Sequence, residues 1–412
     1  MRKTAFAAAA AILLASAAAF AQAPKEITWK KITLTDKFYA EGAYYADFNK
    51  DGKMDVVYGP YWYEGPDFTK KHMIYPPTGN QEGKPFDPKG YSDNFLTFCY
   101  DFNGDGYPDV LVYGHPGTAA ILYLNPGADV DGQWKKIIVH DAADNESQGL
   151  ADIDGIGKPQ GLFHTGGFLG YARPDYTDLT KKWTFVPISP KGKWQRYTHG
   201  YGAGNIAGHT DKKLDIVTSD GWWENPGKEL ATGETWKFHP VKFAAEGAQM
   251  LVYDVDGDGL NDVITAWNCH GYGLVWWKQV KDEKGEITFK ENIILDPKTG
   301  EGVGAAKGVK FTQPHALDLV DVDGDGLKDF VTGKRWWAHG PGGDIDPMSD
   351  PVLYWFQLKR NPDKTVDWIP HLVDKASGVG TQVTGADLNG DGIADFVVGN
   401  KRGGFVFLSQ KP

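Results

Sequence analysis

The chain has 412 residues, with 43 Lys and Arg against 54 Asp and Glu, so its formal net charge is −11. This acidic balance argues against the phosphate backbone of a nucleic acid as the partner. Hydrophobic residues make up 41% of the chain and aromatic residues 13%, which excludes an intrinsically disordered protein.

The N-terminal segment 1–23 has the pattern of a signal peptide. Two basic residues are followed by an apolar run over 5–20, and Ala21-Gln22-Ala23 fits the small-x-small rule for cleavage. We therefore expect an exported protein, periplasmic or secreted, whose mature chain starts at Pro24. No later stretch is apolar enough to cross a bilayer, so we expect no membrane span.

One pattern recurs along the rest of the chain: Asp-x-Asp/Asn-x-Asp-Gly-x-x-Asp, followed by an apolar run. Five complete copies begin at Asp47, Asp101, Asp254, Asp321 and Asp387. Two degenerate copies, which begin at Asp152 and Asn205, fill the gap between the second and third complete copies. The seven starts are 49 to 67 residues apart, and a period of this size indicates a repeat array.

Each repeat is expected to form four short strands. In the second repeat these strands lie at 96–100, 109–114, 119–127 and 134–140. Four-stranded units that repeat radially make a β-propeller, so the seven copies predict an all-β, seven-bladed propeller over residues 24–412.

The two ends of the chain predict how the ring closes. The last strand, 403–410, has no fourth strand after it, and the segment 27–34 matches the fourth strands of other repeats. We expect this N-terminal strand to complete the last blade, because a closed ring leaves no exposed strand edges.

The acidic motif has the residues that Ca²⁺ prefers. Asp or Asn at positions 1, 3, 5 and 9 offers hard oxygen ligands, and Gly at position 6 permits the sharp turn, as in the EF-hand loop. We interpret the loops as structural calcium sites in the hairpin that joins the first two strands of a blade; plain Asp/Gly turns are the alternative. The two degenerate copies have lost ligands. The predicted ligands are Asp47, Asn49, Asp51, Asp55, Asp101, Asn103, Asp105, Asp109, Asp254, Asp256, Asp258, Asp262, Asp321, Asp323, Asp325, Asp329, Asp387, Asn389, Asp391 and Asp395.

On these motifs the chain resembles the FG-GAP/VCBS-repeat propellers, the integrin-type β-propeller architecture, over essentially all of residues 24–412. The resemblance implies a fold and leaves the function open.

A functional site is expected on the face opposite the acidic loops, where the first strand of each blade starts and the second strand ends. Four of the 11 histidines fall on this face, and histidine is the commonest side-chain ligand of Zn²⁺-like metals. The zinc candidates are His199, His315, His115 and His270. His199 and His315 occupy the same register in two blades and make the best pair. The alternative is that each histidine makes an ordinary hydrogen bond at a blade end. His164 and His339 are weaker candidates, and His209 lies on the other face.

Other polar and aromatic residues share this register. Glu146 or Tyr201 is predicted to act as a catalytic base, and Lys334 and Arg335 to orient a hydroxyl or carboxylate. Trp336 is predicted to stack on a sugar ring, because aromatic walls with a few polar groups suit a carbohydrate pocket. Gln313, Asn268 and Gln382 complete the predicted substrate site.

The segment 311–344, FTQPHALDLVDVDGDGLKDFVTGKRWWAHGPGGD, resembles the propeller domain of the fungal aldos-2-ulose dehydratases. In that family the propeller carries a zinc ion and is implicated in eliminating water from keto-sugars such as 1,5-anhydrofructose. The resemblance implies a zinc-dependent carbon–oxygen lyase, in which Zn²⁺ polarises the substrate carbonyl.

Two other functions remain open from the sequence. One is a metal-independent polysaccharide lyase, in which His and Tyr transfer protons and Lys or Arg neutralises a uronate. The other is a carbohydrate-binding or adhesion propeller without catalysis. All three take a carbohydrate as partner, and the sequence carries no indication of an oligomeric state.

Overall fold

The computed structural model describes residues 26–77, 86–127 and 131–411. The predicted signal peptide lies outside these residues. The described chain forms 27 β-strands and one short 3₁₀ turn, η1 (Gly304–Ala306), so the all-β prediction is confirmed. Within the described ranges, no helix is long and apolar enough to cross a membrane.

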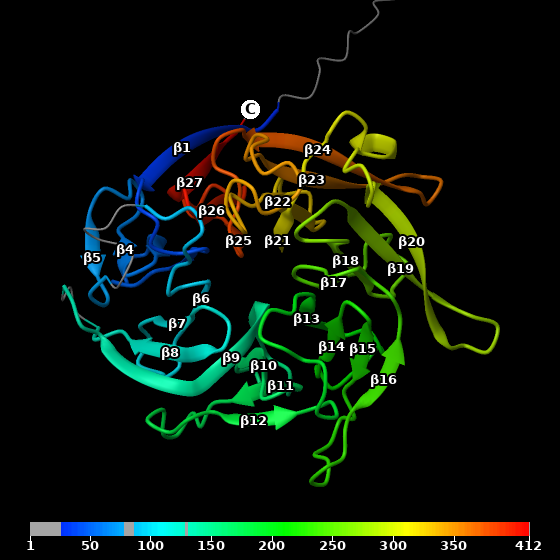
Figure 1. The fold of residues 1–412 in the computed structure, drawn as a ribbon, viewed down its shortest axis with the longest axis horizontal. Helices are drawn as coiled ribbons and strands as arrows, with labels where there is room; N and C mark the ends of the chain where they lie inside the picture. Colours follow the sequence, from blue (N-terminus) through cyan, green and yellow to red (C-terminus); the bar gives the residue numbers. More distant parts are fainter. Residues whose placement is uncertain (1–25, 78–85, 128–130, 412) are drawn as a thin grey trace, which may run out of the picture.

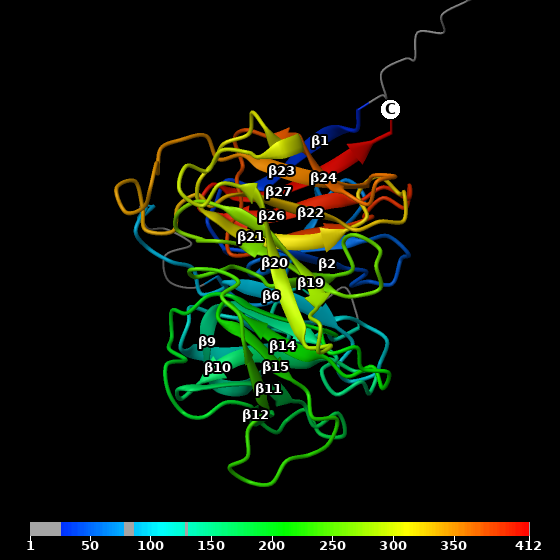
Figure 2. The same ribbon diagram turned by 90° about the vertical axis from the view of Figure 1, so that its right-hand side faces the viewer.

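The strands form sheets arranged around a common centre (Figure 1). The view turned by 90° shows this ring from its edge (Figure 2). The first two repeats and the start of the third contain β1 (Thr28–Thr35), β2 (Tyr44–Ala46), β3 (Asp55–Tyr58), β4 (Tyr61–Tyr63), β5 (Lys71–Met73), β6 (Leu96–Tyr100), β7 (Asp109–Tyr113), β8 (Thr118–Leu124) and β9 (Lys135–Ala151). The third to fifth repeats contain β10 (Gln160–Thr165), β11 (Phe168–Arg173), β12 (Thr184–Pro187), β13 (Tyr201–Gly204), β14 (Asp215–Thr218), β15 (Gly221–Glu224), β16 (Lys237–Pro240), β17 (Leu251–Tyr253), β18 (Asp262–Ala266), β19 (Leu274–Lys281) and β20 (Ile287–Leu295). The last two contain β21 (Pro314–Val320), β22 (Asp329–Lys334), β23 (Leu353–Arg360), β24 (Val366–Asp374), β25 (Val383–Ala386), β26 (Asp395–Asn400) and β27 (Gly403–Gln410).

Five sheets have four strands each, and the second and third repeats share one seven-stranded sheet. They share it because β9 has 17 residues: its first half pairs with β8 and its second half with β10. The sequence predicted a break between these blades. The chain instead bends within one strand at Asn145, which adopts φ 87°, a conformation that Asn tolerates better than most residues.

The predicted pairing of the N-terminal strand is present. β1 lies antiparallel to β27, from the pair Thr28 and Gln410 to the pair Thr35 and Gly404, and completes the sheet of β25, β26 and β27. Neighbouring sheets pack face to face through apolar residues. One such cluster joins Ile264 and Trp276 of the fifth blade to Phe330 and Phe356 of the sixth. Apolar residues that alternate along each strand therefore form the core between neighbouring blades.

The last Asp of each acidic motif holds the start of its blade together. Asp329 is fully buried; its Oδ2 accepts the backbone N–H of Val322 at 2.9 Å, and its Oδ1 accepts that of Leu358 at 2.8 Å. One carboxylate thus ties the motif loop to the third strand, β23. The equivalent carboxylates make the same two kinds of bond in the other complete copies, at Asp55, Asp109, Asp262 and Asp395.

Candidate functional site

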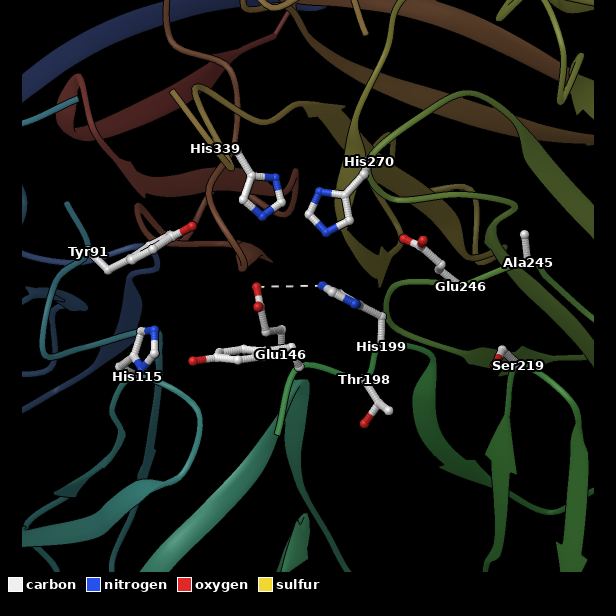
Figure 3. Close-up of a pocket in the computed structure, with 11 residues that line it drawn as sticks. Tyr91, His115, Glu146, Thr198, His199, Ser219, Ala245, Glu246, His270 and His339 are labelled. Carbon is white, nitrogen blue, oxygen red and sulfur yellow. Dashed lines mark ion pairs between the residues drawn. The ribbon is translucent and has the colours of Figure 1, made fainter. Parts of the chain in front are cut away.

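A cavity of about 590 Å³ lies among the loops at the end of the strands opposite the acidic motifs (Figure 3). His199 comes just before β13 and His270 just after β18, so first and second strands both deliver residues to it, in the register that the sequence predicted. The lining residues are Tyr91, His115, Glu146, Tyr197, Thr198, His199, Ser219, Ala245, Glu246, His270 and His339.

Arg335 contacts Glu146 of this cavity and joins three blades. It directly follows β22 and is 1% exposed. Its Nη2 donates to Oε2 of the fully buried Glu41 at 3.1 Å. Its Nη1 donates to Glu146 Oε2 at 3.2 Å and to His315 Nε2 at 2.7 Å. Two of the residues predicted to be catalytic, Glu146 and Arg335, are therefore in direct contact.

Three of the four zinc candidates lie together. The rings of His199, His270 and His315 are nearly perpendicular to one another, with centroids 4.9 to 5.1 Å apart. One ligand atom from each of them and from Cys269 lie within 4.8 Å of one another. Nε2 of His199, Nδ1 of His270 and Nδ1 of His315 are buried. The first lies 3.5 Å from Glu146 Oε2 and the second 3.5 Å from Asp344 Oδ1. The geometry therefore provides a group of imidazoles from three blades.

A second histidine group adjoins the first. His339 Nδ1 lies 2.8 Å from Oδ1 of the buried Asp344, and His270 Nδ1 lies 3.5 Å from the same oxygen. His339 is half exposed. In Figure 3 its other ring nitrogen points toward the middle of the cavity. Asp344 therefore orients His339 with one nitrogen available to a ligand.

The charges of these groups shift one another's pKa values. Burial alone would raise the pKa of Glu146, but His199 and Arg335 outweigh burial and hold that pKa well below its usual range. Burial, followed by the charge of Arg335, lowers the pKa of His315. The hydrogen bond to Asp344 raises the pKa of His339. At neutral pH, Glu146 is consequently an anion and His315 is neutral.

The fourth zinc candidate, His115, lies apart from the other three. It lines the cavity, but its ring contacts Tyr91, Phe95 and Tyr197, with centroids 5.3 to 5.7 Å away. His115 belongs to none of the groups of metal-ligand type found among the described residues.

Several predicted site residues lie in the protein interior. Tyr201 is 2% exposed, its hydroxyl donates to the Gly170 carbonyl at 2.6 Å, and burial raises its pKa well above the usual value. Lys334 is fully buried; its Nζ donates to Thr312 Oγ1 at 3.0 Å, and burial lowers its pKa to about 8. Neither side chain lines the 590 Å³ cavity.

The four predicted substrate residues also lie outside the lining of this cavity. Gln382 bonds both the N–H and the C=O of Thr97, which ties the seventh blade to the second. Gln313 donates to the Ile345 carbonyl, and Asn268 accepts the N–H of His270. Trp336 stacks on Trp337, with centroids 4.4 Å apart. These contacts shape the loops of the site without facing the cavity.

The remaining histidines have local partners. His164 is 1% exposed, its Nδ1 lies 2.9 Å from Thr198 Oγ1, and burial lowers its pKa to about 3. His209 bonds Asp215 at 2.8 Å in the degenerate fourth motif, on the face where the sequence placed it.

Eight cavity or cluster residues were not singled out from the sequence: Tyr91, Tyr197, Thr198, Ser219, Ala245, Glu246, Asp344 and Cys269. All eight lie between strands, in loops whose paths no periodic pattern encodes. The only indication for Cys269 was its position beside His270.

In the acidic loops, the carboxylates of positions 1, 3 and 5 gather in the two copies that have Asp at all three. Asp254, Asp256 and Asp258 form one such group, and Asp321, Asp323 and Asp325 the other. The ammonium of Lys278 lies against Asp256 and Asp258. Burial raises the pKa of every position-9 carboxyl, to about 6 for Asp55 and Asp395, about 7 for Asp109 and Asp262, and about 8 for Asp329.

Comparisons with known proteins support the fold. The family model for the FG-GAP repeat matches residues 379–409, which contain the seventh motif and strands β25 to β27. No curated protein matches the chain. The crystal structure of BBS1N in complex with ARL6DN, soaked with lead, aligns at a TM-score of 0.51 and 11% identity, over 93% of this chain and 97% of that chain. The crystal structure of rhamnogalacturonan lyase YesW aligns at a TM-score of 0.41 and 14% identity, over 92% of this chain and 72% of that chain. The chain thus carries an FG-GAP repeat in a propeller-like fold.

Proposed function

We propose that this protein is a zinc-dependent carbon–oxygen lyase that acts on keto-sugars or oxidised glycosides. The observation that carries the proposal is the group of His199, His270 and His315, three imidazoles from three blades beside an open cavity. The resemblance of 311–344 to the dehydratase propellers, which includes His315, points to the same chemistry.

The residues of this group suit zinc, which binds imidazole nitrogens and thiolates. His199 Nε2 and His270 Nδ1 are buried, and each has a carboxylate oxygen at 3.5 Å, from Glu146 and Asp344, that orients it. His315 offers one ring nitrogen to Arg335, so binding of zinc at that nitrogen requires Arg335 to release it and keep its bond to Glu41. A bound zinc ion would polarise the substrate carbonyl and acidify the neighbouring C–H.

The chain's own residues then carry the protons. His339, held by Asp344, is better placed as base than Glu146, whose pKa is held low, or Tyr201, whose hydroxyl is buried and bonded. The proton leaves carbon for His339, the C–H electron pair forms the C=C bond, and the β-substituent departs with the electrons of its C–O bond. Arg335 holds Glu146, which lines the cavity, in place.

The metal content tests this proposal. After loading with ZnCl₂ and dialysis, we expect about one zinc per chain by mass spectrometry of the metals. The His199→Ala/His315→Ala variant should retain less than about a tenth of it and lose turnover of 1,5-anhydrofructose. His371→Ala, on the outer strand β24, is the matched control and should keep both.

A second candidate function, a metal-independent polysaccharide lyase, is favoured by the 2.7 Å contact between Arg335 and His315. In that case a guanidinium fills the place of the metal. Turnover of a uronate polymer that survives chelation would select this function. Zinc-free protein that binds sugars without turnover would select a carbohydrate-binding propeller instead.

We also propose that the protein is exported, that the pairing of β1 with β27 closes the propeller, and that the five complete motifs bind structural calcium. The gathering of the carboxylates of positions 1, 3 and 5 in two of the motifs supports the calcium sites, because Ca²⁺ takes several hard oxygen ligands.

Removal of calcium is therefore expected to lower the melting temperature by several degrees. A site at a hundredfold excess of ligand over its dissociation constant adds about 2.7 kcal/mol to the free energy of unfolding. Calorimetry in millimolar calcium and in EGTA measures the difference. Equal melting temperatures under the two conditions would reject the calcium sites, whatever the result for zinc.

A further inference from the structure

The cavity has two chemically different sides. His199, His270 and Glu246 bring nitrogen and carboxylate groups to one side, and Tyr91 and His115 lie on the opposite side in Figure 3. Tyr197 lines the same cavity. Tyr91, His115 and Tyr197 are called the aromatic wall below.

The rings of the aromatic wall support one another from two distant stretches of the chain. His115, which follows β7, lies 5.3 Å from Tyr91 and 5.7 Å from Tyr197, centroid to centroid. The fully buried Phe95 packs behind them, 5.4 Å from His115 and 5.8 Å from Tyr91. These contacts hold the wall in place before any ligand arrives.

The wall keeps a large apolar surface in contact with solvent. Tyr197 is 56% exposed and lines the cavity, so a ligand in the cavity can cover its ring. Two cations lie over rings of the wall: the Lys401 ammonium, which donates to the Pro88 carbonyl, is 4.7 Å from the Tyr91 ring, and the exposed Arg196 guanidinium is 6.0 Å from the Tyr197 ring. A sugar ring that stacks on aromatic faces suits this surface.

The size of the cavity indicates how much substrate it holds. A cavity of about 590 Å³ lies within the range of about 300–1,000 Å³ that is typical of pockets for drug-sized ligands. His199 and His270 lie on the side opposite Tyr91 and His115 in Figure 3, so a ring bound at the histidines leaves the aromatic wall free for a second ring.

We propose that the aromatic wall binds a second sugar ring, so that the substrate is a glycoside rather than a free monosaccharide. This inference rests on the proposed function for the identity of the reacting ring. The ring that reacts lies at the histidines, and the ring on the wall is the part that positions it. Tyr197 is then a specificity-determining residue, and Trp336, which the sequence favoured for stacking, is not.

Binding of unreactive sugars tests the proposal without turnover. The probes are glucose and the disaccharides cellobiose and maltose, measured by titration calorimetry. We expect at least one disaccharide to bind wild-type protein about tenfold more tightly than glucose. Tyr197→Ala should weaken disaccharide binding about five- to tenfold and leave glucose binding unchanged, whereas Tyr197→Phe keeps the ring and should bind as wild type does.

Two control titrations show whether the effect belongs to Tyr197. Tyr107→Ala removes a tyrosine from the acidic-loop face and should change nothing. The same titrations with His199→Ala/His315→Ala should still show the effect of Tyr197, which separates this proposal from the fate of the zinc site. Disaccharide binding that does not depend on Tyr197, or that never exceeds glucose binding, would overturn it.

Discussion

We expect Arg335→Met to lower the free energy of unfolding by about 3–5 kcal/mol, because removing one partner of a buried ion pair leaves the other charge unpaired. Arg335 is 1% exposed and Glu41 is fully buried, so water cannot replace the lost guanidinium. Burial alone would lower the pKa of Arg335, but Glu41 and Glu146 outweigh burial and hold that pKa above its usual value. The two carboxylates therefore depend on this cation.

Urea unfolding followed by tryptophan fluorescence measures the loss. Lys334→Met is the matched control: Lys334 is just as buried, but its Nζ bonds the neutral Thr312 hydroxyl, so we expect a smaller loss. Glu41→Gln/Arg335→Met should recover part of the stability, because it removes the stranded charge. An Arg335→Met protein as stable as the wild type, or a double variant no better than the single one, contradicts this account.

The periodic part of the molecule could be predicted from the sequence. The repeated acidic motif marks one hairpin in each blade, and the alternation of apolar residues on both sides of it gives the strands. The pairing of 27–34 with 403–410 followed from a count of strands, and β1 and β27 show it. The predicted break between the second and third blades was wrong. It falls inside β9, where no Gly or Pro separates two strands until Gly149.

The sequence predicted the level of the site residues along the propeller axis but not the direction in which each side chain points. The shared register of the first strands predicted the level of Glu146, His199 and His315, and these three lie together. Tyr201 and Gln382 were expected near that level, but their side chains turn into the contacts between blades. Direction depends on how each loop bends, which is a property of tertiary packing.

Loop residues carry most of what was missed. Asp344 lies far from any motif, and Tyr197 and Glu246 lie in the loops that precede the first strands; each reaches the cavity or its histidines through the path of its loop. Their positions depend on contacts between distant segments.

We expect Asp329→Ala to lower the free energy of unfolding by about 2–4 kcal/mol, because it leaves two buried backbone N–H groups without acceptors, and each such group costs about 1–3 kcal/mol. The groups belong to Val322 and Leu358, in the loop and in β23. Asp329→Asn should lose less, because its amide oxygen still accepts one of the two bonds. The third repeat shows that a neutral acceptor suffices: Oε1 of Gln160 accepts the N–H groups of Ile153 and Asp154.

Asp325→Ala separates this role from calcium binding. Asp325 is the exposed position-5 residue of the same motif. In EGTA we expect Asp325→Ala to unfold at nearly the same urea concentration as the wild type and Asp329→Ala to unfold well below it. In millimolar calcium, Asp325→Ala should lose the part of the stability that one bound ion contributes. If both variants were equally destabilised in EGTA, position 9 would have no structural role of its own. The order expected here follows from burial: a carboxylate sealed between two strands is needed for the fold, and one at the surface is needed only for the ion.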